Sequence, residues 1–275
     1  MITGANYLYH HLQKFGLLMH IGKGNTPSKT EAMYFPAPKQ QQRPEDTANF
    51  DVADGFVSFT QEFRYLGSII HNSLKSDADV NTRITKATAA FGALHDCFFS
   101  NRRVSLKDKG RVYAILVLTI LLHGSECWSL REDLYDRLRV FHNRCVRTLC
   151  RVTMRQVHRH RIRQDTLNAR VGLQSLDYYY STRLLRWAGH VSRMPWHRTP
   201  RKLLTSWVRH KRPVGAPSMT FGRTLNKALK SAGISTLAAT WMREAQDRNA
   251  WRDSTKKNQN NLQFNERIIP PSLHW

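Results

Sequence analysis

The stretch DVNTRITKATAAFGALHDCFF, residues 79–99, decides the fold class because its apolar positions repeat with the period of a helix. The side chains that share this apolar face are Val80, Ile84, Ala87, Phe91, Leu94 and Phe98. The sequence before it is aromatic and β-branched in short blocks, as in EAMYFP (31–36) and FVSFTQEFRYLGSIIH (56–71). We therefore predict a mainly α fold with a small β part, in which short strands precede a long run of helices.

Helical spacing continues towards the carboxyl end. Ser105 with Asp108, and Ser129 with Glu132, resemble capping boxes that begin two more helices, the first over residues 106–123. The spacing also predicts helices over residues 161–170, 176–192, 200–209, 220–232 and 237–253. Before residue 79, Gly67 predicts a tight bend between two strands, and a proline-rich segment predicts a flexible loop.

The formal net charge of +23 is distributed unevenly over the 275 residues. Residues 1–100 hold nine basic and nine acidic side chains, whereas residues 101–275 hold 34 and 11. Such a surplus repels itself in a compact protein unless a polyanion neutralises it, and arginine suits the planar oxygens of phosphate. Nucleic acid is therefore the expected partner.

The expected compartment is intracellular, in the cytoplasm and nucleus. Four scattered cysteines do not form the framework of a secreted domain, and the amino end does not resemble a signal peptide. The longest uncharged apolar run, VYAILVLTILL (112–122), is about half of the roughly 20 residues needed to cross a bilayer. We expect no membrane partner.

The acids, cysteines and histidines do not form a catalytic or metal-binding pattern. Three acid pairs are close enough in sequence to hold Mg²⁺, but each lies in the loop or the first turn of a predicted helix: Asp51 with Asp54, Asp77 with Asp79, and Glu132 with Asp133. Cys145 and Cys150 are five residues apart on a helix, so they do not face one ligand position. We predict no catalytic residue and no metal site, and a structural role for these groups.

Arginine is the strongest functional signal. In residues 147–163 it recurs every fourth position, with Arg144 and Arg161 nearby, and no acid occurs between Asp136 and Asp165. One continuous helix would align these side chains into a ladder along a phosphate backbone. The alternative is a solvated basic face, although such faces usually carry interspersed acids. The predicted nucleic-acid contacts are Lys107, Lys109, Arg111, Arg144, Arg147, Arg151, Arg155, Arg159, Arg163, Arg186, His190 and Arg193.

Three of these contacts belong to RLLRWAGHVSRM, residues 183–194. Arg186, His190 and Arg193 share one helix face, opposite a face of apolar side chains. His190 has no carboxylate or cysteine at a usable spacing, so we interpret it as a phosphate contact or a packing residue. Gly189 predicts a close approach between helices, and Trp187, Trp241 and Trp251 are expected in the core.

Eight segments, in this order, resemble the carboxy-terminal part of the reverse transcriptase of non-LTR (LINE-type) retrotransposons, particularly RTE-like elements. They are FGLLMHIGKGNTPSKTEAMYF (15–35), FRYLGSII (63–70), DVNTRITKATAAFGAL (79–94), KGRVYAILVLTILLHGSECWSL (109–130), LRVFHNRCVRTLC (138–150), LLRWAGHVSRM (184–194), RPVGAP (212–217) and WMREAQDRNAWR (241–252). The resemblance spans about residues 15–252. It departs from the family at Val146, where relatives have leucine, and in the inserted residues 22–27.

The resemblance implies a role for three parts of the chain. The segment at 15–35 is similar to the palm's motif D, which makes Lys29 the lysine near an incoming nucleotide. The segment at 63–70 is similar to motif E, the primer grip. The resemblance implies that the primer-grip residues are Phe63, Tyr65, Leu66, Gly67 and Ser68. The catalytic aspartates of the family would precede Met1, so we expect a truncated RNA-directed DNA polymerase that binds template and primer. Alone it would not polymerise, and Mg²⁺ would belong to the missing palm.

The implied organisation has six parts. They are a palm remnant (1–38), a flexible loop (39–55), a primer-grip-like hairpin (56–75), thumb helices (76–150), a basic carboxy-terminal helical domain (151–255) and a loose tail (256–275). The expected partners are RNA, DNA or an RNA/DNA hybrid, and the missing amino-terminal polymerase part. The alternative is an inert mobile-element relic or a helical protein-interaction module.

Overall fold

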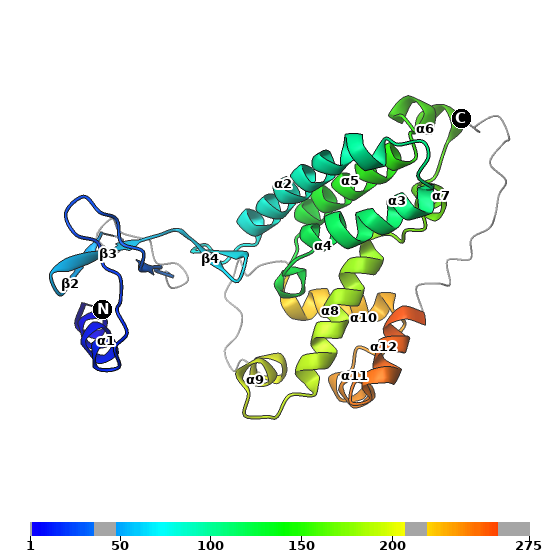
Figure 1. Cartoon of the computed structure of the whole chain (residues 1–275). Helices are drawn as coiled ribbons and strands as arrows, with labels where there is room; N and C mark the ends of the chain where they lie inside the picture. The colour runs from blue at the N-terminus through cyan, green and yellow to red at the C-terminus, as the bar shows by residue number, and fades with distance from the viewer. Residues whose placement is uncertain (1, 36–47, 207–218, 258–275) are drawn as a thin grey trace. The chain divides into compact units, whose positions relative to one another are not determined.

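The computed structural model describes residues 2–35, 48–206 and 219–257, which are mainly helical with a small β part, as predicted (Figure 1). The chain divides into two compact units, Met1–Arg83 and Ile84–Trp275. Among the described residues every strand lies in the first unit. The second unit is helical and continues across residue 150, where the sequence predicted the thumb helices to end and the carboxy-terminal domain to begin. The division into those two domains stays a prediction. The expected RPVGAP turn and most of the expected tail lie outside the described residues.

Among its described residues, the first unit contains helix α1, five short strands and the first turns of the following helix. Their bounds are α1 (Ile2–Lys14), β1 (Glu31–Ala32), β2 (Phe50–Val52), β3 (Gly55–Phe59), β4 (Glu62–Tyr65) and β5 (Ser68–His71). The sheet order is β1-β3-β2, with β1 parallel and β2 antiparallel to β3. Residues 50–52 are thus a strand, so the expectation that all of 39–55 is a loop is wrong. Val52 is fully buried against Val57 and Ile21, and this apolar packing favours the strand.

Strands β4 and β5 form a separate two-stranded hairpin whose turn the sequence predicted. Tyr65 pairs with Ser68, so the connecting turn is only Leu66 and Gly67, with φ of 47° and 91°. Positive φ at both central residues gives the turn twist that two-residue hairpins favour. Glycine adopts this conformation without strain, whereas Leu66 does not.

The hairpin is held to the next helix by a buried ion pair. Arg83 lies 3.5 Å from Asp79, measured from Nε to Oδ1, and both side chains are about 5% exposed. Asp79 also accepts a hydrogen bond from the backbone N–H of Ile69 at 3.1 Å, and Arg83 donates to the carbonyl oxygen of Gly67 at 2.5 Å. The pair therefore fixes the turn and the second strand of the hairpin to the first turns of a helix.

Helices make up the rest of the described chain. Their bounds are α2 (Asp77–Leu94), η2 (His95–Phe99), α3 (Leu106–Val112), η3 (Tyr113–Val117), α4 (Leu118–Leu121), η4 (Ser125–Cys127), α5 (Glu132–Leu149), α6 (Met154–His160), α7 (Gln164–Arg170), α8 (Leu176–Ser192), α9 (Thr199–Thr205), α10 (Phe221–Ser231), α11 (Ala238–Glu244) and α12 (Arg248–Lys257). Ser105 caps α3 as predicted, with its hydroxyl accepting from the Asp108 N–H. Ser129 does not cap α5: the N-cap is Arg131, whose side chain instead pairs with Asp133.

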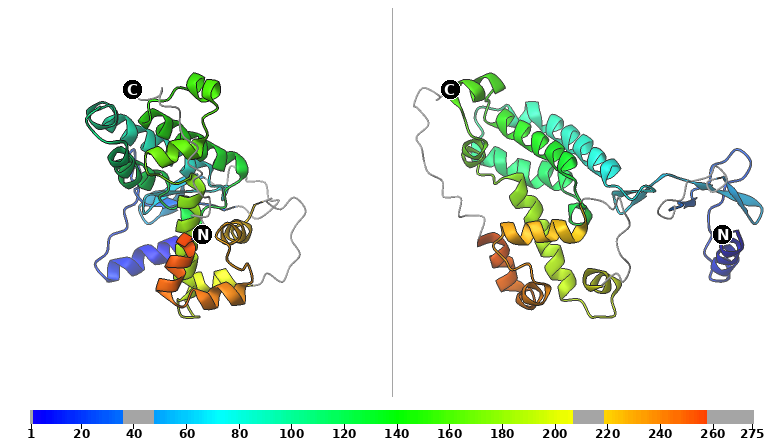
Figure 2. Two further views of the ribbon diagram at one scale, coloured as in Figure 1. Left: turned by 90° about the vertical axis from the view of Figure 1, so that its right-hand side faces the viewer. Right: turned by 180° about the vertical axis from the view of Figure 1, so that it is seen from behind.

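In the second unit α8 connects two groups of helices. Helices α2, α3 and α5 lie side by side at one end, and α10, α11 and α12 gather around the other half of α8 (Figures 1 and 2). The second group encloses a core that includes the predicted Trp241 and Trp251, each 3% exposed. Trp251 donates from Nε1 to the Leu185 carbonyl oxygen at 2.9 Å, and a Cβ on Gly189 would meet its ring. The predicted close approach at Gly189 is confirmed.

A second close approach joins α3 to the chain after α7. A Cβ added to Gly110 would lie 1.9 Å from the carbonyl oxygen of Val171, which is backbone and has little freedom to move. Gly110 is buried in the middle of a helix, where glycine normally costs about 0.5–1 kcal/mol relative to alanine. The contact with Val171 explains why this position favours glycine.

The Gly110→Ala substitution is therefore expected to lower the free energy of unfolding by about 1–3 kcal/mol, against the usual helix preference. Gly92→Ala on α2 is the matched control, because nothing lies within 4 Å of its added Cβ. That variant is expected to stabilise the protein by about 0.5–1 kcal/mol. Urea unfolding of both variants measures the difference, and equal effects at the two positions would contradict the contact.

The first group of helices contains a buried histidine. The Nδ1 atom of His142 lies 3.0 Å from the hydroxyl oxygen of Tyr113, and both side chains are fully buried. Burial lowers the pKa of His142 from 6.5 to about 4. The same burial raises the pKa of the neighbouring Cys145 thiol to about 12. Both groups are therefore neutral at pH 7 and serve packing.

Stability is expected to fall as the pH is lowered from about 6.5 to about 4. In this window the unfolded chain binds a proton at His142 that the folded chain does not, so the loss is on the order of 3 kcal/mol. His142→Phe is expected to flatten the dependence in this window, whatever its effect at pH 7. His158→Gln on the exposed face of α6 is the control and keeps the slope. Chemical unfolding between pH 4 and 7 measures it.

Candidate nucleic-acid interface

The arginine-rich segment is not one continuous helix. Helix α5 ends at Leu149, and Arg151 follows with a left-handed φ of 56°. A new helix then begins at a capping box, in which the Thr153 hydroxyl accepts from the Gln156 N–H while the Gln156 side chain accepts from the Thr153 N–H. The capping box competes with helix propagation, so the ladder on one straight helix is wrong. The arginines are divided among α5, α6 and the turns around them.

Exposed basic side chains collect where these turns meet. They come from the loop before α3, the first turn of α3, the second half of α5, and α6 with its flanking turns: Arg102, Arg103, Lys107, Arg144, Arg151, Arg155, Arg159 and Arg161. We call this set the basic end. Within the described residues none of its side chains has an acidic partner.

The acids closest in sequence to the basic end are occupied by other groups. Asp96 lies 2.7 Å from the His95 ring, between Oδ1 and Nδ1. Asp108 and Asp165 pair with two predicted contacts, Arg111 at 3.5 Å and Arg163 at 3.4 Å. Arg111 and Arg163 remain exposed but share their charge with these acids. The basic end therefore carries a positive charge that the neighbouring carboxylates do not neutralise.

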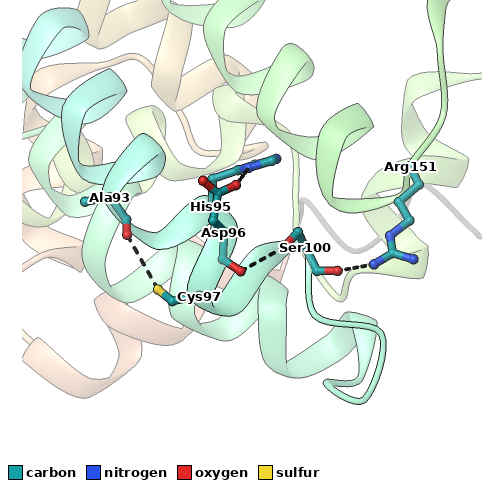
Figure 3. A network of polar contacts seen from close by, with 6 residues as sticks. All are labelled: Ala93, His95, Asp96, Cys97, Ser100 and Arg151. Carbon is teal, nitrogen blue, oxygen red and sulfur yellow. Dashed lines mark hydrogen bonds and ion pairs between the residues drawn. The ribbon is translucent and has the colours of Figure 1, made fainter.

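A hollow opens in this surface between the end of η2 and the last turn of α5. Its lining residues are His95, Phe99, Ser100, Arg102, Thr148 and Arg151. Arg151 donates from Nη2 to the Ser100 carbonyl oxygen, and the Ser100 hydroxyl donates to the Asp96 carbonyl oxygen at 2.9 Å (Figure 3). The hydroxyl of Thr148 donates to a backbone carbonyl oxygen in the preceding turn. Because both hydroxyl groups already donate within the protein, Arg102 and Arg151 are the main donors that the lining residues offer to a ligand.

Two predicted contacts have structural roles instead. Lys109 is 2% exposed, so its side chain does not form an exposed phosphate contact, and burial together with the charge of Arg151 lowers its pKa. Arg193 is half-buried and donates from Nη1 to the Ala245 carbonyl oxygen at 2.5 Å. Arg193 was predicted from its place on a helix face, and such spacing cannot show the backbone that packs against a side chain.

The remaining predicted contacts are distributed over two helices. Arg147 is half-buried in the last turn of α5, next to the basic end. Arg186 and His190 are exposed on α8, whose second half packs against α10 and α12. Figure 1 shows the second half of α8 beside α10 and α12 and away from α6.

The predicted primer-grip residues form the β4–β5 hairpin of the first unit. Phe63, Tyr65 and Leu66 are 38%, 59% and 81% exposed, so the hairpin presents apolar side chains to its surroundings. Gly67 is the second residue of the turn, and Ser68 is the first residue of β5, where it pairs with Tyr65. Lys29 is exposed, and its backbone N–H donates to the His20 ring at 3.1 Å.

Sequence reasoning missed two features of these sites. Arg102 and Arg103 were interpreted only as part of a basic turn. The Asp79–Arg83 pair that holds the hairpin was also missed. Its i, i+4 spacing on a helix was the available signal.

The described ranges contain neither a metal-ligand cluster nor a membrane-spanning helix. In residues 2–35, 48–206 and 219–257, no three histidine, cysteine or acidic side chains are grouped so as to bind a metal ion. Over the same part of the chain, no helix is long and apolar enough to span a bilayer.

Comparison with known proteins links the chain to mobile elements. It is 27% identical over 268 residues to an uncharacterized transposon-derived protein of Caenorhabditis elegans, and the match covers 94% of this chain and 91% of that relative. No protein-family model matches the chain. No solved structure matches it either. The similarity to the nematode protein supports an origin in a transposable element.

Proposed function

We propose that the chain derives from the thumb and carboxy-terminal region of a non-LTR retrotransposon reverse transcriptase and binds nucleic acid through its phosphates. The observation that carries this proposal is the basic end, eight exposed cationic side chains whose neighbouring acids are already paired. Arginine donors in such a surface bind phosphate oxygens with charge-assisted hydrogen bonds. The transposable-element origin and the order of the eight sequence segments support the polymerase ancestry.

The proposed contacts read the backbone and not the bases. Guanidinium and ammonium groups on α5, α6 and the loop before α3 neutralise phosphates, and this kind of contact carries no sequence information. The expected ligands are RNA, DNA and an RNA/DNA hybrid, with little dependence on sequence. In the proposed ancestor, the β4–β5 hairpin positioned the end of the primer.

Fluorescence anisotropy with labelled RNA/DNA hybrid, duplex DNA and single-stranded RNA tests the proposal. At low salt the full chain is expected to bind all three, and an unlabelled duplex of unrelated sequence is expected to compete with each. An inert relic or a protein-interaction module does not bind them. Failure to bind any of the three at low salt would contradict the proposed function.

A further inference from the structure

The hollow in the basic end has features that a general phosphate-binding surface does not need. It is lined by residues of η2, of the loop after η2 and of the end of α5, which are far apart in the sequence. Two arginines line it from different elements, Arg102 from the loop after η2 and Arg151 from the turn after α5. Convergent donors from two elements suit a compact anion better than a strand lying across a flat surface.

Both guanidinium groups have donors to spare. The side chain of Arg102 is exposed and has no hydrogen bond or ion pair within the part of the chain that the structure describes. Arg151 uses Nη2 for the Ser100 carbonyl oxygen, and arginine has five N–H donors in total. Figure 3 shows the Arg151 guanidinium against the Ser100 carbonyl oxygen, and both residues line the hollow.

The backbone at Arg151 carries strain that glycine would relieve. The residue follows the C-cap of α5 with a φ of 56°, a position where helices most often place glycine. A non-glycine residue in this conformation costs on the order of 1 kcal/mol. The backbone at Arg151 therefore suits glycine at least as well as arginine.

The charge balance around the hollow also favours an anion. Lys109 is buried close enough to Arg151 for the arginine charge to lower the lysine pKa, so the two groups repel each other. The acid next to the lining residues is Asp96, which pairs with the His95 ring and is 97% exposed. A doubly charged anion in the hollow would relieve this repulsion more than a singly charged one.

Two aromatic side chains, His95 and Phe99, also line the hollow. The Phe99 ring is 2% exposed and stacks on the Phe91 ring behind it, with centroids 4.8 Å apart. The exposed part of the His95 ring offers a face on which a terminal base can stack.

We infer that the hollow binds the terminal phosphate monoester of a nucleic-acid strand, with Arg102 and Arg151 as its ligands. The inference rests on the proposed function and makes it more specific. A terminal monoester carries up to two negative charges and three free oxygens, whereas an internal phosphodiester carries one charge and two free oxygens. Both guanidinium groups can therefore bind the terminal phosphate of a strand at once. A strand end also enters the hollow from one side only, whereas an internal phosphate has strand leaving it on both sides.

The test compares single-stranded oligonucleotides of one sequence that carry a 5′-phosphate, a 3′-phosphate or two hydroxyl ends. Binding to the full chain is measured by competition against a labelled oligonucleotide. One of the phosphorylated strands is expected to bind about tenfold more tightly than the unphosphorylated strand, corresponding to one extra charge-assisted contact. The arm that shows the preference identifies the end that is bound.

Substitutions then locate the preference. Arg102→Gln and Arg151→Gly are each expected to abolish it, and Arg151→Gly is expected to do so without loss of stability, because glycine suits the backbone there. Arg252→Gln on α12 makes the same change of charge away from the hollow and is expected to keep the preference. Equal binding of all three strands would overturn this inference and leave the proposed function standing. Binding of none would overturn both, and a preference that survives Arg102→Gln would overturn the assignment to the hollow.

Discussion

The Asp79→Ala substitution is expected to lower the free energy of unfolding of the first unit by about 3–5 kcal/mol, because it leaves the charge of Arg83 buried without its carboxylate. The same change removes the acceptor for the Ile69 N–H, which belongs to the second strand of the hairpin. Chemical unfolding measures the stability, and amide hydrogen exchange at Ile69 measures the release of the hairpin.

Three variants control this prediction. Asp79→Asn keeps an acceptor for the Ile69 N–H and is expected to cost less. The double variant Asp79→Leu with Arg83→Met removes both charges and is expected to recover much of the loss, since apolar replacements of a buried pair are often tolerated. Asp96→Ala removes a carboxylate that is 97% exposed and is expected to be nearly neutral. A loss below about 1 kcal/mol for Asp79→Ala would contradict the anchoring role.

The triple variant Arg144→Gln, Arg155→Gln, Arg159→Gln is expected to bind an RNA/DNA hybrid about 1,000-fold more weakly at low salt. Each lost charge-assisted contact is worth roughly a factor of ten. The three side chains are exposed and without acidic partners within the described residues, so folding is expected to be preserved. Anisotropy titration measures the affinity, and circular dichroism checks the fold.

Its matched control removes three charges from other helices of the same unit. Arg198→Gln, Lys230→Gln and Arg252→Gln lie at the N-cap of α9, on α10 and on α12. This variant lowers the net charge equally but leaves the basic end intact, so it is expected to lose less than tenfold. Equal losses in the two triple variants would show that net charge alone, and not the basic end, determines binding.

Local sequence patterns predicted much of the fold. Helix α8 begins and ends at residues 176 and 192, as the spacing predicted, because its apolar residues face a core along the whole helix. The turn at Leu66 and Gly67 was also predicted, since glycine marks a backbone that few other residues adopt. These features depend on neighbours within a few residues, which the sequence shows directly.

Features that depend on distant neighbours could not be predicted in the same way. Lys109 and Arg193 were expected at a phosphate surface. Long-range packing buries Lys109, and Arg193 donates to the carbonyl oxygen of Ala245, between α11 and α12. The hollow depends on η2 and α5 lying together, although Ser100 and Arg151 are 51 residues apart.

A salt titration of RNA/DNA hybrid binding tests the central claim most directly. The logarithm of the association constant is plotted against the logarithm of the salt concentration. For a duplex, the slope becomes more negative by about 0.9 for each phosphate that the protein neutralises. If the basic end engages at least four phosphates, the slope is expected to be about −3.6 or steeper. The Arg144, Arg155 and Arg159 triple variant is expected to reduce the slope by about 2.7. A slope near zero, or no binding at low salt, would contradict nucleic-acid binding through the basic end.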